Sequence, residues 1–184
     1  MRGLVILVPL LLVFLLWLIV QYNSLVDLRN HISESWSNVD TELKRRYDLI
    51  PNLVSTVKGY AAHERETLER LVELRNRCAD NHGPVSSQEH DEMQLVDALK
   101  QVFVVVENYP QLKADQHFLK LQVELTNTEN RIQAARRFYN GNVRDYKNKC
   151  EVFPSNLVAS TFNFSPHDFF SVPPAVAEVP EMNF

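Results

Sequence analysis

The residues best able to do chemistry in this sequence lack the spacing that catalysis requires. His63 and Glu64 begin the HExxH pattern of zinc peptidases, but Thr67 occupies the position of the second histidine ligand. None of the six histidines follows a glutamate by three residues, as in the Glu-x-x-His pairs of di-iron bundles. The sequence therefore predicts no catalysis, no metal and no cofactor. A catalytic site assembled from residues far apart in the sequence is the minor alternative.

A polar cluster beside a proline is the strongest candidate for a binding site. It consists of Lys44, Arg45, Arg46, Asp48, Pro51 and Asn52. A proline inside a helix frees a backbone carbonyl and displaces charges from the regular helix face, which favours docking of a ligand or a partner. The competing interpretation, which we favour, is a solvated charged rim around a structural kink.

The first segment of the chain is apolar enough to cross a bilayer. Residues 4–20 are apolar apart from Pro9, and residues 3–26 carry no charge. At ~1.5 Å per residue the two stretches cover about 25 and 36 Å, which bracket the ~30 Å hydrocarbon core. A cleaved signal peptide is the alternative, but no small-x-small site follows. We expect a single-pass anchor over residues 1–24, with the bilayer as partner of residues 4–20.

The orientation of this anchor is weakly specified. Arg2 precedes the apolar segment and Arg29 follows it. Both lie close enough to its ends for the rule that basic residues favour the cytoplasmic side of a membrane. We expect the amino terminus inside and the bulk of the chain outside, with the opposite orientation as the alternative.

Three long helices follow the anchor in the sequence pattern. Apolar residues recur every three or four positions over residues 22–78, 86–109 and 115–153. Seams of this length predict an all-α, elongated antiparallel bundle with coiled-coil-like packing over residues 25–153. Pro51 is expected to kink the first helix. Alternatively, a reversal over residues 47–51 would divide the bundle into four segments.

Residues 154–184 form an extended tail rich in proline and phenylalanine. Disordered segments are usually poor in aromatic residues, so we expect this tail to pack on the bundle with some rings in a groove. The rings belong to Phe162, Phe164, Phe169, Phe170 and Phe184. A partner-docking peptide is the alternative.

Charge distribution offers a second use for this tail. Residues 131–149 hold six Lys or Arg against one acid, whereas residues 151–184 hold four acids and no base. The tail could lie across the basic helix. We favour a solvated helix face and a tail that do not meet in a specific way.

Cys78 and Cys150 are a candidate disulfide. The three-helix path places both at the membrane-distal end, and the four-segment path places both at the proximal end. A bond needs Cα atoms within ~7 Å and an oxidising compartment. Two unpaired cysteines on partly buried helix faces are the favoured alternative.

Four motifs resemble the LemA family of bacterial membrane proteins. They are YNSLVDLRN at residues 22–30, SWSNVDTELKRRYDLIPNLVSTVKGYAAHERETLE at 35–69, RRFYNGNVRDYKNK at 136–149 and FPSNLVASTFNF at 153–164. The resemblance implies a single-pass membrane protein with a helical bundle and no assigned catalysis. An association of one relative with magnetosome membrane formation hints at membrane organisation.

Two functions follow as hypotheses. The first is a membrane-anchored interaction scaffold with protein partners, which could also self-associate. The second is a ligand-binding sensor that uses residues 44–51. The net charge of −4 gives no reason to expect nucleic acid as a partner.

Overall fold

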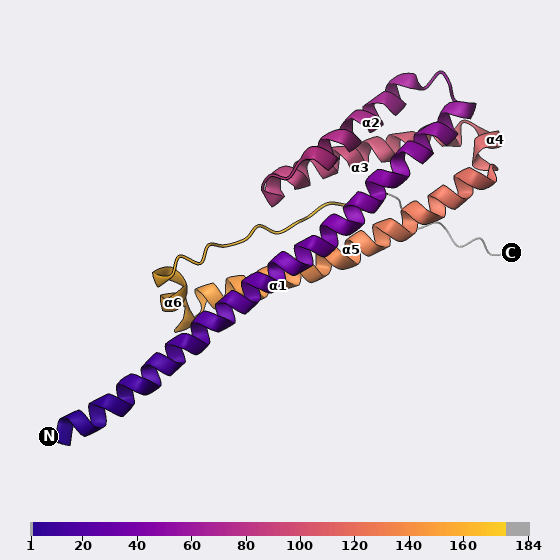
Figure 1. The fold of residues 1–184 in the computed structure, drawn as a ribbon. Coiled ribbons are helices and arrows are strands. Elements are labelled where there is room, and N and C mark those ends of the chain that lie inside the picture. Colours follow the sequence, from indigo (N-terminus) through magenta and orange to yellow (C-terminus); the bar gives the residue numbers. More distant parts are fainter. Residues whose placement is uncertain (1, 176–184) are drawn as a thin grey trace.

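The computed structural model describes residues 2–175, with side chains from Leu7 onward, and this part of the chain is helical without a strand. The helices are α1 Arg2–Tyr60, α2 Arg65–Asp80, α3 Val85–Glu107, α4 Pro110–Lys113, α5 Gln116–Glu151 and α6 Ser155–Thr161. They form an elongated antiparallel bundle from which the amino-terminal part of α1 projects (Figure 1). The predicted all-α class is confirmed.

Helix α1 joins the apolar segment to the bundle without a break. It is long and apolar enough to cross a membrane, and the apolar window within it is not buried by the rest of the protein. From Leu25 onward, α1 contributes a regular series of buried core residues. One helix therefore belongs to both the candidate membrane span and the bundle core.

The alternative of a chain reversal at residues 47–51 is wrong, as is the prediction that the first helix continues to Cys78. Helix α1 passes through Pro51 to Tyr60, and the chain reverses at residues 61–64. Pro51 cannot donate to the carbonyl of Tyr47, four residues earlier. Arg75 Nε of α2 donates to that carbonyl instead, at 3.0 Å. The gap in the helix ladder thus becomes a docking point for α2.

Helices α1 and α5 pack antiparallel along most of the bundle. Asn142 donates to the carbonyl of His31, Arg46 pairs with Glu129, and Tyr60 donates to Asp115 at the far end. Asp115 also caps the amino terminus of α5 by accepting from two backbone N–H groups. In these three pairs the residue number increases along α1 and decreases along α5 by nearly the same amount. The carboxyl-terminal end of α5 therefore lies beside the end of the apolar segment of α1.

The tail folds back over α5 after the short helix α6, which the expectation of an extended tail did not include. Asn140 both accepts from the backbone N–H of Phe170 and donates to its carbonyl, at 2.9 Å each. Arg136 donates to the carbonyl of Val172, and Tyr139 to that of Asp168. The favoured expectation that the tail and the basic helix do not meet specifically is therefore wrong: they meet through hydrogen bonds between α5 side chains and the main chain of the tail.

The tail buries some of its rings, as expected, but not all of them. Phe170 is fully buried against Trp36, with ring centroids 5.3 Å apart, and Phe164 is half-buried beside Tyr22. Phe162 and Phe169 remain exposed. Phe184 lies outside the described residues.

Candidate functional site

The six residues of the predicted polar cluster do not form one site. Lys44 and Arg45 lie on the surface, where they pair with Asp40 at 2.6 Å and Glu42 at 3.4 Å. Asp48 is 79% exposed, 3.7 Å from Arg75. Pro51 and Asn52 are also exposed. These five residues therefore lie on the outer face of α1, where charged and polar side chains form an exposed rim around Pro51.

Arg46 points the other way, into the core. Its guanidinium is 1% exposed and contacts Glu92 of α3 and Glu129 of α5, the latter at 2.9 Å. Tyr47 donates its hydroxyl to the other oxygen of Glu92. We call Arg46, Tyr47, Glu92 and Glu129 the Arg46 cluster. It connects the three long helices of the bundle at mid-length.

The tail completes this cluster. The backbone N–H of Ala175 donates to Glu129 Oε2 at 3.1 Å, and Ala175 is 2% exposed. Burial of a carboxylate is unfavourable unless its oxygens are hydrogen-bonded, so the tail supplies a donor that the helices lack. Arg46 Nε is buried without a hydrogen-bond partner among the described residues.

Electrostatics keep Arg46 charged and the hydroxyl of Tyr47 protonated. Burial alone would lower the pKa of Arg46, but the attraction of Glu92 and Glu129 outweighs burial and holds it above its ordinary value. Burial, and then the charge of Glu92, raise the pKa of Tyr47, so its hydroxyl stays a donor. With all four side chains nearly inaccessible, the cluster cross-links the bundle and offers no open surface to a solute.

Glu92 and Glu129 were not predicted as site residues from the sequence, although the sequence contains a signal for them. Glu92 lies three and four residues before the buried Leu95 and Val96. Glu129 lies four residues after Leu125 and three before Ile132, on the buried face of α5. A glutamate in phase with the apolar face of each helix, together with an arginine in phase on α1, predicts a buried ion pair.

The two cysteines are free and far apart. Cys78 is buried on α2, one turn after Arg75, which donates a hydrogen bond to the carbonyl of Tyr47. Cys78 therefore lies near the level of Tyr47 on α1. Cys150 lies at the end of α5, level with about Leu25 of α1. These levels differ by about 20 residues of α1, or ~30 Å, far more than a disulfide allows. The prediction that both cysteines lie at one end is wrong.

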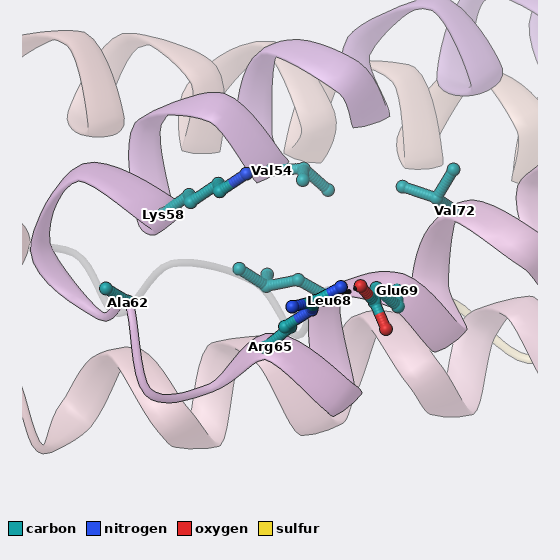
Figure 2. A pocket seen from close by; sticks show the side chains of 7 residues that line it. All are labelled: Val54, Lys58, Ala62, Arg65, Leu68, Glu69 and Val72. Atoms are coloured by element: carbon teal, nitrogen blue, oxygen red, sulfur yellow. Dashed lines mark hydrogen bonds and ion pairs between the residues drawn. The ribbon is translucent and has the colours of Figure 1, made fainter.

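A cleft of about 570 Å³ opens where α1 turns into α2. Val54, Leu68 and Val72 form its apolar wall, and Lys58, Arg65 and Glu69 bring charges to it (Figure 2). We call it the hinge cleft. Its volume lies in the range of small-molecule sites, and its mixed lining resembles that of such sites.

A second hollow lies between α5 and the tail. It has a volume of about 710 Å³ and is lined by Arg136, Arg137, Asn140, Gly141 and Arg144 of α5 and by Phe169, Ser171, Val172 and Pro173 of the tail. We call it the basic groove. Three arginines beside an exposed aromatic ring favour contact with an acidic or planar group.

These features define a class: a helical-bundle protein whose first helix also carries a segment that is compatible with a single membrane span. The model of the LemA family matches residues 35–184. This chain belongs to the LemA family.

Three relatives place the chain within this family at low identity. Protein LemA of Metamycoplasma hominis is 26% identical over 137 residues, which cover 74% of this chain and 63% of the relative. Magnetosome protein MamQ 2 of Paramagnetospirillum magneticum is 24% identical over 88% of this chain and 69% of the relative. Magnetosome protein MamQ of Magnetospirillum gryphiswaldense is 23% identical over 90% and 70%. The chain thus spans less than two thirds of the length of the first of these relatives.

Proposed function

We propose that this protein is a membrane-anchored interaction scaffold without catalysis of its own. The observation that carries the proposal is the continuity of α1, which passes from an exposed apolar segment into the bundle core as one helix. A helix of 59 residues is about 90 Å long, of which the uncharged part covers about 36 Å. The bundle would therefore stand on the bilayer as a stiff extension of its own anchor.

The basic groove is the proposed contact surface for a protein partner with an acidic segment. Arg144 is 68% exposed, and its nearest acid, Asp145 at 3.5 Å, is itself exposed. Exposed ion pairs of this kind contribute little to stability, so Arg144 can exchange its partner at little cost.

A role in membrane organisation is proposed from the magnetosome proteins among the relatives. The bulk of the chain is proposed to lie outside the cytoplasm, which reporter fusions at the carboxyl terminus would test.

Photo-crosslinking in intact cells tests the scaffold. A crosslinking amino acid replaces Phe138, which is 71% exposed beside Arg137, or Val104 of α3, which is 61% exposed on another helix. We expect discrete protein adducts from position 138, reduced at least about tenfold by Arg137→Glu with Arg144→Glu, because both charges face an acidic segment. Position 104 serves as the matched control. Equal adducts at both positions, or none at 138, would contradict the proposal.

Ligand sensing is the second candidate function, and the hinge cleft is the observation that favours it. The predicted sensor residues 44–51 divide between the surface and the Arg46 cluster, so the cleft one to three turns further along α1 is the better location. A thermal-shift panel of small anions and metabolites on the full-length protein would test this function. A compound whose stabilisation is lost in Lys58→Ala but kept in Lys44→Ala supports the cleft, and stabilisation unaffected by Lys58→Ala contradicts it.

A further inference from the structure

The corner between α5 and α6 exposes large apolar side chains that the bundle does not use. Val152 is 59% exposed, Phe153 75%, Leu157 56% and Phe162 50%. On α6 itself, Val158 and Ala159 face the bundle and Leu157 faces outward. We call residues 152–162 the apolar corner. Four such side chains on neighbouring positions indicate a surface that something apolar covers.

This corner lies beside the end of the apolar segment of α1. Helix α6 packs against α1 at the end of the bundle from which the amino-terminal segment of α1 projects (Figure 1). The ring of Tyr22 meets Phe162 edge-on, with centroids 5.0 Å apart. Trp17 and Leu18 are partly buried against the bundle, while the preceding residues 7–16 are exposed. The corner therefore borders the last turns of the apolar segment through the contact of Phe162 with Tyr22.

Charge follows the same boundary. Residues 152–166 carry no Asp, Glu, Lys or Arg, and neither do residues 3–26 of α1. Lys147 and Lys149 lie within five residues before the corner, with Glu151 directly before it and 4.0 Å from Lys147. Arg29 of α1 lies 5.6 Å from the centre of the Phe164 ring. Apolar and aromatic side chains bordered by basic residues match the boundary between acyl chains and anionic headgroups.

We propose that the apolar corner is a second membrane contact, with the headgroup region of the lipid bilayer as its partner. The inference rests on the proposed membrane span of α1. A single span allows the bundle to tilt and rotate about its axis. Insertion of Phe153 and Leu157 at one side of the span would fix which face of the bundle looks toward the membrane.

The position of the corner argues against a second copy of the chain as its main cover. If α1 crosses the bilayer up to about Val20, Phe162 at the end of α6 already lies at the level of the headgroups through its contact with Tyr22. Lipid would then reach the corner without any further association.

Depth-resolved quenching in liposomes tests this contact on the full-length chain. Single cysteines replace Leu157 or Phe153 in the corner, Leu12 in the apolar segment, or Val104 near the far end of the bundle, in a Cys78→Ala, Cys150→Ser background checked for native helicity. Each carries an environment-sensitive fluorophore. The liposomes contain anionic lipid and nitroxides at shallow or deep positions of the acyl chain.

We expect shallow nitroxides to quench the corner probes at least about threefold more than the Val104 probe, because the corner would lie in the headgroup region. Deep nitroxides should quench Leu12 most. Corner probes that behave like Val104 while Leu12 is quenched would overturn the inference and leave the span intact. An unquenched Leu12 probe would overturn both. Corner probes shielded from lipid nitroxides and from aqueous iodide alike would show that protein covers the corner, which also overturns the inference.

Discussion

Arg46 is the side chain that joins α1 to α3 and α5, and the tail bonds to its partner Glu129. Removing its charge would leave Glu92 and Glu129 facing each other in the core, both almost fully buried. We predict that Arg46→Met lowers the free energy of unfolding by about 3–5 kcal/mol, because two buried carboxylates lose their counter-ion. Denaturant unfolding of the protein in detergent, followed by circular dichroism, would measure this loss.

Lys44→Met is the matched control, since Lys44 is two positions away, 62% exposed and paired only with Asp40. Its effect should stay within about 0.5 kcal/mol. Replacing all three charged residues in one variant, Arg46→Met with Glu92→Leu and Glu129→Leu, should recover part of the stability that Arg46→Met alone loses. Equal losses in Arg46→Met and Lys44→Met would contradict the burial of Arg46.

The two cysteines should differ in reactivity. Cys78 is 6% exposed, and burial, followed by the charge of Glu92, raises the pKa of its thiol. Since the thiolate is the nucleophile, Cys78 should resist alkylation at pH 7.5 until the protein unfolds, whereas the half-buried Cys150 should react in the native protein in detergent. Mass spectrometry after timed alkylation would count the adducts. One disulfide and no free thiol after denaturation would contradict the structure.

The sequence allowed part of this residue-scale result to be predicted. Arg46 was part of the predicted polar cluster, but its neighbours Lys44 and Arg45 carry the same charge. Only their positions around the helix distinguish the inward-facing Arg46 from the outward-facing Lys44 and Arg45. The partners Glu92 and Glu129 lie 46 and 83 residues away in the chain. Their pairing depends on how the helices align, which spacing within one helix does not specify.

At the scale of elements, Pro51 and Arg75 work as a pair. We predict that Arg75→Met destabilises the protein by about 1–2 kcal/mol, because the carbonyl of Tyr47 loses a charged donor. In a Pro51→Ala background, the alanine N–H can satisfy this carbonyl, so Arg75→Met should have a smaller effect. A double-mutant cycle of unfolding free energies would give the coupling. Identical effects of Arg75→Met in both backgrounds would contradict the pairing.

Asn140 holds the tail against α5. Its amide makes two hydrogen bonds to the backbone of Phe170, as a neighbouring strand would. We predict that Asn140→Ala releases the tail and makes residues after 162 cleavable at protease concentrations that leave the parent intact, because both groups of Phe170 lose their partner. Asn148→Ala, at an exposed position of the same helix, is the control. Equal protection of the tail in both variants would count against this role.

Periodicity was a good guide to the helices and a poor guide to their ends. The apolar repeat continues in phase across residues 61–64, with Val57 before the turn, Ala61 at its start and Leu68 after it, all buried. Two helices that pack on a common core can keep one repeat through the turn between them, so the pattern did not show the reversal. Pro51 suggested a bend or turn, yet Arg75 supplies the missing donor from another element, which local sequence rules do not consider.

The whole molecule can be described as one long helix around which the remaining chain folds. Helix α5 returns along α1, the pair α2 and α3 packs on its distal part, and the tail runs back along α5 to the Arg46 cluster (Figure 1). Because α1 contains both the proposed membrane span and part of the bundle core, that span would set the height and direction of every groove on the bundle. The bilayer-compatible segment and the bundle were predictable from composition and periodicity. The return path of the tail depends on hydrogen bonds from α5 side chains to the main chain of the tail, which an apolar repeat does not indicate.

The central claim is that α1 anchors the bundle in the membrane, and carbonate extraction of isolated membranes tests it most directly. The full-length protein should remain in the pellet at high pH, because an apolar helix of about 20 residues stays inserted when peripheral contacts are stripped. The same chain without residues 1–24 should appear in the soluble fraction after extraction, even if the apolar corner binds lipid reversibly. Release of the full-length protein into the carbonate supernatant would contradict the account.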